Sequence, residues 1–260
     1  MKNLFSGKWF IAIKVLPWVV GIILLKLVLD KFGLEPLSLS PLFNSIIAAN
    51  VFLLGFLLAG TLADYKESER LPGELAASIE TLYDEFEITY KNKKSPVAKN
   101  AIALLGDFNT LLINWFYKKE RTKTLMDKIC RFNDLFLDLE RLTQPNFIAR
   151  LKQEQHNIRR NLIRIHTIRE TSFVAAGYAV AEITTGLLIL GFLFAKIEPF
   201  YESLFFVGAT TFLMIYMIAL IKDLDNPFDH YTDGKETTVV SLKPLKDVEE
   251  RIKEELKRIK

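Results

Sequence analysis

The sequence contains little that could build a metal or disulfide site. Its single cysteine, Cys130, cannot form an intramolecular disulfide or a paired-thiolate zinc site, and we expect a buried or neutral thiol there. The three histidines, His156, His166 and His230, are too scattered to suggest the spacing of metal ligands. We therefore expect no disulfide framework and no cofactor.

Catalytic signatures are also absent. The sequence has no G-x-S-x-G nucleophile elbow, no Walker loop, no H-E-x-x-H pair and no dinucleotide-binding fingerprint. Without such a motif, no group of side chains is marked out as a nucleophile or a general base. We expect neither an enzyme nor a protein that binds nucleic acid.

Long uncharged runs, by contrast, are prominent. Hydrophobic residues make up 50% of the chain and the mean hydropathy is +0.18, although 25% of the residues are charged, so the two kinds must be segregated. Segments 36–63 and 203–221 contain no charged residue, and Glu182 alone interrupts 171–195. Each segment can cross a hydrocarbon core of about 30 Å, which needs roughly 20 helical residues.

A further span is expected at 10–29, although Lys14, Pro17 and Lys26 interrupt it. The alternative is a secretory signal peptide. A membrane anchor is favoured because the apolar stretch is long for a signal-peptide core and no small-x-small cleavage site follows it. Both lysines lie near the ends of the segment, where their long side chains can reach the lipid headgroups.

The distribution of positive charge predicts the topology. Lysine and arginine concentrate in 64–170 and after residue 221, whereas the connections at 30–41 and 196–202 carry one lysine each. By the positive-inside rule, both connections lie outside and both termini are cytoplasmic. The predicted fold class is an all-α membrane protein with four transmembrane helices and long cytoplasmic helical extensions.

The predicted segments follow one another in a simple order. They are a cytoplasmic N-terminus at 1–9, a first span at 10–29, an external loop at 30–41, a second span at 42–63, a cytoplasmic helical domain at 64–171, a third span at 172–195, an external turn at 196–201, a fourth span at 202–221 and a cytoplasmic tail with an amphipathic helix at 222–260. The helical domain is thus inserted between the second and third spans.

Prolines mark helix starts within the cytoplasmic domain. Pro72 and Pro145 are each expected to begin a helix, and Ser95 is expected to cap one whose first residue is Pro96. From Ile148 onward, apolar residues follow the spacing of three and four that is typical of a helix-bundle seam, and no helix breaker precedes the third span. We therefore expect one long helix from there into the membrane.

The tail ends in a strongly amphipathic segment that starts near Pro244. Charged residues cover one side of the expected helix, and the apolar side comprises Leu245, Val248, Ile252, Leu256 and Ile259. The expected partner of the apolar side is the cytoplasmic bundle or a neighbouring subunit, because the many glutamates disfavour a lipid surface.

The second span carries the strongest local pattern. Small residues and two phenylalanines recur at spacings of three or four along one helical stripe, which comprises Asn44, Ala48, Phe52, Phe56, Ala59 and Ala63. One interpretation is helix packing, in which small residues let backbones approach. The other is a pore face, in which rings of Phe52 and Phe56 in an oligomer form a hydrophobic constriction. The spacing alone favours packing.

Short motifs beyond the stripe change that balance. Segment 52–56, Phe-Leu-Leu-Gly-Phe, followed by Leu71 and Pro72, resembles the F-x-L-G-F and L-P signature in the second helix of bestrophins, the pentameric anion channels. The N-P-F or D-P-F motif of the same family is matched after the fourth span by Asp225, Asn226, Pro227 and Phe228. With the four-span layout, these motifs make the chain similar to the bestrophin-like membrane proteins, including divergent prokaryotic members.

The resemblance implies a homo-oligomer, a pentamer in that family, that conducts anions, with chloride favoured, in a bacterial inner membrane. Phe52 and Phe56 would then be neck residues at the narrowest part of the pore, with Asn44 and Ala59 on the same face. Ala48 stands where the family commonly has a bulky aliphatic residue, which would leave the outer neck ring wider or absent. The implied partners are inorganic ions, membrane lipid and further copies of the chain.

Two departures from the family pattern bear on metals and selectivity. The family can carry an acidic calcium clasp after the last span, whereas His230 and Tyr231 interrupt the run here and leave as candidates Asp223, Asp225, Asp229 and Asp233. A calcium site needs several converging oxygens, so a solvated turn is favoured. The family's tryptophan and arginine at the cytoplasmic end of the second helix are also missing, and 64–70 mixes acids and bases instead.

Glu182 is the remaining anomaly, because an ionised carboxylate that faces lipid is costly. It must face protein or water, or be protonated. Two interpretations stay open: a hydrogen bond across helices to the Thr184 hydroxyl or to Asn50, and a role in the pore or in proton transfer.

The first functional hypothesis is an oligomeric bestrophin-like ion channel with its pore lined by the second span. The alternative is a non-conducting membrane scaffold or sensor that binds a partner through its cytoplasmic helices. A channel predicts water-accessible residues along the stripe from Asn44 to Ala63, whereas a scaffold predicts a dry, packed one. A transporter that uses Glu182 is disfavoured because neither inverted repeats nor broken helices are visible in the sequence.

Overall fold

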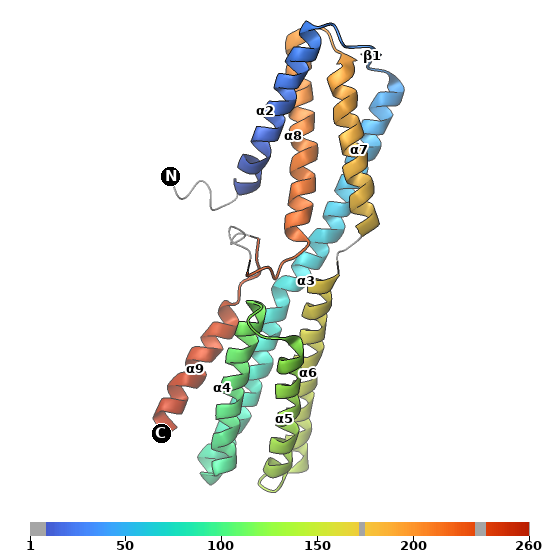
Figure 1. Ribbon diagram of the computed structural model, residues 1–260. Coiled ribbons are helices and arrows are strands. Elements are labelled where there is room, and N and C mark those ends of the chain that lie inside the picture. The colour runs from blue at the N-terminus through green and yellow to red at the C-terminus, as the bar shows by residue number, and fades with distance from the viewer. Residues whose placement is uncertain (1–8, 172–174, 232–237, 260) are drawn as a thin grey trace. The chain divides into compact units, whose positions relative to one another are not determined.

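The fold consists of helices joined by short connections. A computed structural model describes residues 9–171, 175–231 and 238–259 (Figure 1). These residues divide into two units. The membrane unit comprises the described residues 9–65, 175–226 and 238. The bundle unit comprises the described residues 66–171, 227–231 and 239–259.

The membrane unit contains α2 (Phe10–Lys31), the first part of α3 (Pro41–Lys93), α7 (Ala175–Phe194) and α8 (Phe200–Leu224). Among the described residues, these helices hold four stretches that are long and apolar enough to cross a membrane. Helix α8 lies against α2 and α7 (Figure 1). The core of the unit joins α3, α7 and α8 through Leu54, Leu57, Ala181, Leu188, Met214 and Ile221. The predicted fold class, an all-α membrane protein with four spanning helices, is confirmed.

A short parallel strand pairing lies at one end of the membrane unit. Strand β1 (Leu37–Ser38) follows α2, and β2 (Ala195–Lys196) follows α7, with Leu37 opposite Ala195. The sequence does not predict this pairing, because two residues are too few to show a strand alternation.

Lys26 of α2 differs from the prediction that it reaches the lipid headgroups. Its side chain is only 1% exposed and forms an ion pair with Glu35. The ammonium group also donates to the backbone carbonyls of Leu193, at 3.3 Å, and Ala195, at 2.5 Å. Burial is sustained because one carboxylate and two carbonyls accept from the three ammonium protons, which replaces the hydration that the group has lost.

The bundle unit contains the second part of α3, followed by α4 (Pro96–Phe116), α5 (Thr122–Glu140), α6 (Pro145–Glu170) and α9 (Lys243–Ile259). Helix α4 lies against α5 and α9, and α5 lies against α6 (Figure 1). The predicted helix starts at Pro96 and Pro145 are confirmed. The Ser95 hydroxyl caps α4, since it accepts a hydrogen bond from the backbone N–H of Val97 at 3.2 Å.

Cys130 lies on the outer side of α5, so of the expected buried or neutral thiol the buried alternative is wrong. Its neighbours Ile129 and Phe132 are buried, and this helical phase turns the intervening residue outward. The amphipathic phase of the helix therefore decides the exposure of Cys130, rather than the apolar character of its side chain.

Helix α3 corrects one predicted boundary, because it continues without interruption through Pro72. Proline removes one backbone N–H from the helical ladder, at a cost of about 3 kcal/mol. The adjacent Leu71 and Leu75 are buried. Their packing in the bundle unit offsets the cost of the proline and keeps the helix intact.

The long helix predicted from Ile148 into the third span is interrupted. Helix α6 ends at Glu170, and Thr171 has an extended backbone with φ −120° and ψ 127°. The Thr171 N–H still donates to the carbonyl of Thr167 at 3.0 Å, and the Thr171 hydroxyl donates to the same carbonyl at 2.7 Å. Residues 172–174 lie outside the described residues, and α7 begins at Ala175.

Helix α9 is the predicted amphipathic helix, and its apolar side packs on α4 in the bundle unit. The residues that this packing buries are Leu245, Val248 and Ile252. Gly106 of α4 permits the close approach, because a Cβ atom there would lie 3.1 Å from Ile252 Cγ2. Asn109 of α4 donates to the backbone carbonyl of Leu245 at 2.9 Å. The bundle is therefore the partner of α9, as the first of the two predicted partners.

Candidate functional site

One face of α3 in the membrane unit is exposed along the predicted stripe. The exposed side chains are Asn44, Ala48, Phe52, Phe56, Ala59 and Ala63. The two phenylalanines are 77% and 62% exposed. On the opposite face, Leu54 and Leu57 are buried against α7 and α8. The stripe is therefore turned away from the core of the membrane unit.

Asn50, the polar residue predicted within the second span, is buried between α3 and α7. Its amide nitrogen donates to the Thr185 hydroxyl at 3.0 Å, and its amide oxygen accepts from the Thr184 hydroxyl at 2.6 Å. Both halves of the amide are satisfied, as a polar group in apolar surroundings requires. Because Phe52 is two residues further on, it lies on the opposite side of the helix. The Asn50 contacts thus turn the stripe away from α7.

Glu182 pairs with a lysine that the sequence interpretation did not name. Its carboxylate lies 2.7 Å from the ammonium group of Lys222 on α8. Of the two interpretations of Glu182, the hydrogen bond to Thr184 or Asn50 is not formed, since those two side chains bind each other. A lysine is the stronger partner for a carboxylate, since the opposite charges offset the cost of ionised groups within a membrane.

Tyr178 of α7 connects three helices of the membrane unit. Its hydroxyl donates to the Asp225 carboxylate at 2.7 Å, at the end of α8. It also lies 3.4 Å from the hydroxyl of Thr61 on α3. Asp225, the first residue of the predicted post-span motif, is therefore hydrogen-bonded to α7. The sequence interpretation missed Tyr178, whose one signal is a phenol hydroxyl within an apolar helix.

The post-span motif, Asp225 to Phe228, is divided between the two units. Asp225 and Asn226 end the membrane-unit segment, whereas Pro227 and Phe228 belong to the bundle unit. In the bundle unit, Phe228 is fully buried and its ring centre lies 5.8 Å from that of Phe116. The aromatic position of the motif thus contributes to the core of the bundle unit.

The calcium candidates are held in different ways. Asp223 lies half-buried on α8, Asp225 accepts from Tyr178, and Asp229 is buried in the bundle unit. Asp233 lies outside the described residues. Within 9–171, 175–231 and 238–259, no group of three or more histidine, cysteine, aspartate or glutamate side chains is arranged to hold a metal ion.

His230 lies among aromatic side chains of the bundle unit. Its ring meets Phe116 edge to face, with 5.9 Å between ring centres, and its centre lies 5.6 Å from that of Tyr117. Burial, together with the positive charges of Arg169 and Lys246, lowers the pKa of His230 from 6.5 to about 4. The imidazole is therefore neutral in the folded protein at neutral pH.

Acidification should weaken the fold through His230. In the unfolded chain the imidazole takes up a proton near pH 6.5, whereas in the folded chain it does so only near pH 4, so stability falls as the pH drops between these values. In the variant His230→Gln, the thermal unfolding midpoint should depend less on pH over this range than it does in the wild type. His156→Gln is the control, because His156 is exposed on α6, and it should keep the wild-type slope. An unaltered slope in His230→Gln would contradict this assignment.

Comparison with solved structures identifies the fold. A bacterial bestrophin homologue from Klebsiella pneumoniae, solved by Zn-SAD phasing, gives a TM-score of 0.76 at 13% identity, over 92% of this chain and 97% of that chain. Two point-mutant structures of a homologue from the same bacterium give TM-scores of 0.79 and 0.77 at 13% and 14% identity, over 94% and 95% of this chain and 99% and 98% of theirs. No protein-family model and no curated protein matches the sequence. The chain has a bestrophin fold, and the resemblance indicated by its motifs is confirmed at the level of the fold.

Proposed function

We propose that this chain forms an oligomeric ion channel whose pore is lined by the exposed stripe of α3, and that it conducts anions, chloride foremost. The observation that carries the proposal is the orientation of α3, with Leu54 and Leu57 in the core of the subunit and Phe52 and Phe56 exposed. In a closed ring of copies, such faces converge on the symmetry axis. The shared fold with bacterial bestrophin homologues supports this arrangement. A pentamer is the copy number that the family resemblance of the motifs implies.

The chemistry of the stripe suits a hydrophobic neck. Between Asn44 and Ala63 it offers methyl groups and two phenyl rings, so water held there is weakly bound and the constriction can gate by dewetting. The edges of phenyl rings carry partial positive charge, and rings that present their edges to the axis favour anions over cations. Phe52 and Phe56 would thereby form the hydrophobic gate and also favour the passage of anions.

The proposal includes a membrane topology. The spans are 10–29, 42–63, 172–195 and 202–221, in a bacterial inner membrane, with both termini and the bundle unit in the cytoplasm. The lysine and arginine residues of 64–170 and of the tail support this orientation.

Planar-bilayer recording in a potassium chloride gradient tests the proposal. Wild-type protein should give currents that reverse toward the chloride equilibrium potential. The variant Phe52→Ala/Phe56→Ala should conduct more or gate differently, because the neck is widened. The matched control is Phe205→Ala/Phe206→Ala, which removes two exposed rings of α8 and should conduct as the wild type does.

Three other outcomes would count against parts of the proposal. A reversal toward the potassium potential would reject anion selectivity. Equal changes in both double variants would reject the stripe as the pore lining. Silence from protein of verified oligomeric mass would reject conduction and favour a membrane scaffold or sensor.

A further inference from the structure

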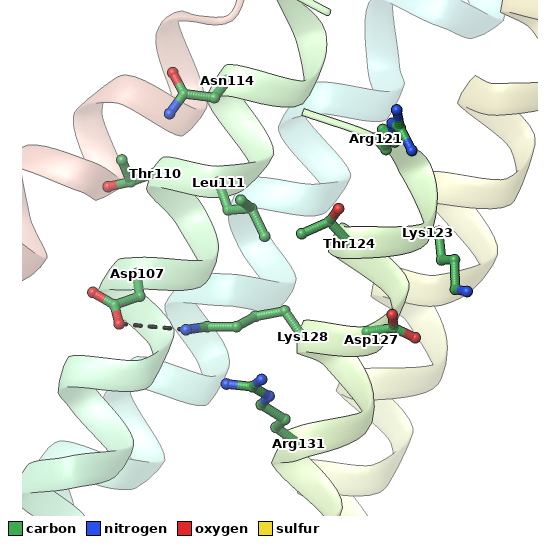
Figure 2. A pocket seen from close by; sticks show the side chains of 10 residues that line it. All are labelled: Asp107, Thr110, Leu111, Asn114, Arg121, Lys123, Thr124, Asp127, Lys128 and Arg131. Carbon is green, nitrogen blue, oxygen red and sulfur yellow. Dashed lines mark hydrogen bonds and ion pairs between the residues drawn. The ribbon is translucent and has the colours of Figure 1, made fainter. Parts of the chain in front are cut away.

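A groove between α4 and α5 of the bundle unit has the chemistry of an anion site. Its volume is about 620 Å³, within the range of about 300–1,000 Å³ that small-molecule pockets occupy. Figure 2 shows its lining side chains, and among them Lys128 and Arg131 extend from α5 toward α4. The groove lies wholly within the bundle unit and is separate from the stripe of α3.

The lining of the groove is positively charged. Its cationic side chains are Arg121, Lys123, Lys128 and Arg131, and its carboxylates are Asp107 and Asp127. Four cations and two carboxylates leave a net charge of +2. On α5 the lining residues 124, 128 and 131 follow helical spacing, so one helical face supplies them, and Arg121 immediately precedes the helix.

Most of these cations are not neutralised by the fold. In the part of the chain that the structure describes, Arg121, Lys123 and Arg131 form no ion pair, whereas Lys91, Arg150 and Arg251 of the bundle unit each do. Lys128 lies 3.4 Å from Asp107, whose side chain is 73% exposed. The Lys128 side chain is 20% exposed, and a pair whose carboxylate is this accessible to water is weak and can be exchanged for a ligand.

The remaining lining defines the class of ligand. Arginine side chains bind phosphate groups through paired hydrogen bonds, and Thr124 and Asn114 add further donors. Helix α5 begins at Thr122, so the unpaired N–H groups of its first turn lie at the same end of the groove as Arg121. Leu111 is the single apolar lining residue and no aromatic residue lines the groove, so it offers no surface on which a nucleobase could stack.

We propose that this groove binds a small, non-aromatic molecule that carries several phosphate groups, such as an inorganic polyphosphate or a phosphorylated polyol. The proposal is independent of ion conduction. Lys128 and Arg131 contact the phosphates from α5, while Asp107 opposes them and limits the affinity. The ligand therefore competes with Asp107 for Lys128.

Calorimetric titration of the purified full-length chain with sodium tripolyphosphate tests the site. We expect saturable binding that weakens as salt is raised, since the contacts are charge-assisted. The variant Lys128→Gln/Arg131→Gln should bind at least about tenfold more weakly, because two charge-assisted contacts are lost. Arg160→Gln, which removes an exposed arginine on α6, is the matched control and should bind as the wild type does.

The variant Asp107→Asn should change the affinity in the opposite direction. A gain in affinity cannot be explained by misfolding, so this variant controls for that cause of weaker binding. Removal of this carboxylate should strengthen binding several-fold, because it frees Lys128. Absence of saturable heat in the wild type, or an equal loss in Arg160→Gln, would overturn the proposal. So would unchanged or weaker binding in Asp107→Asn.

Lipid headgroups share the phosphate chemistry, and the bilayer composition distinguishes the two sources. The chain is titrated in nanodiscs of phosphatidylcholine and in nanodiscs that contain phosphatidylglycerol. Equal tripolyphosphate binding in both supports a soluble ligand. If the wild type binds tripolyphosphate in phosphatidylcholine nanodiscs but not in those that contain phosphatidylglycerol, the groove binds anionic headgroups. That result would overturn the proposal of a soluble ligand.

Discussion

Lys26→Met should lower the free energy of unfolding by about 3–5 kcal/mol, as expected when a buried ion pair loses one partner. Methionine can fill the space of the lysine stem but leaves the Glu35 carboxylate without its cation. It also leaves the carbonyls of Leu193 and Ala195 without their donor. Thermal unfolding of the purified chain in detergent measures the loss.

Two further variants separate charge pairing from a general effect of the substitution. Lys14→Met changes an exposed lysine of the same helix and should leave the unfolding midpoint nearly unaltered. Lys26→Met/Glu35→Gln should regain part of the stability lost in Lys26→Met, because no unpaired charge is then buried. If Lys26→Met were as stable as Lys14→Met, the buried pair would have no structural role.

Phe228→Ala should destabilise the bundle unit by about 3–5 kcal/mol, the range for removal of a buried aromatic side chain. The ring of Phe228 is fully buried and contacts that of Phe116, so its removal leaves a cavity that the surrounding helices fill only in part. Chemical denaturation monitored by tryptophan fluorescence suits this measurement. The ring centre of Trp115 lies 5.2 Å from that of Phe116, which contacts Phe228, so Trp115 reports on this part of the core.

Leu137→Ala provides the comparison for Phe228→Ala, since Leu137 is an exposed apolar residue of α5. It should change stability by no more than about 0.5 kcal/mol. Phe228→Leu should fall between the two, because it retains most of the apolar volume. A Phe228→Ala effect as small as that of Leu137→Ala would mean that this motif position does not stabilise the bundle.

The spanning helices and α9 are predictable because their signals are local. A charge-free run of sufficient length is visible in the sequence before anything is known of its neighbours, and so is the alternation of Leu245, Val248 and Ile252 with charged residues. The motifs at 52–56 and at Asp225 to Phe228 indicate the fold for a similar reason, since each is a short contiguous pattern.

The errors at Lys26, Pro72 and Glu182 concern residues whose state depends on packing partners elsewhere in the chain. The burial of Lys26 requires Glu35 and carbonyls more than 160 residues further along the chain. The continuity of α3 through Pro72 depends on packing that the local breaker signal does not contain. Glu182 is paired with Lys222 rather than with the nearer Thr184, because helix rotation decides which side chain meets it.

The groove between α4 and α5 illustrates an intermediate case. The helical spacing of Thr124, Lys128 and Arg131 is visible in the sequence, but so are many other polar helical faces. Only the packing of α5 against α4 brings Lys128 and Arg131 opposite Asp107 and forms the open groove between them. A candidate site on helix surfaces therefore becomes recognisable once the relative rotation of the two helices is known.

The Lys26 contacts have a consequence for the ionic environment of the protein. A carboxylate and two carbonyl oxygens resemble the ligands of a bound alkali or alkaline-earth ion, and here the cation is covalently attached to the chain. It cannot be diluted away, and salt screens a buried pair far less than an exposed one. At the end of the membrane unit that holds β1 and β2, the charge of Glu35 is therefore balanced by Lys26 and does not require a dissolved cation.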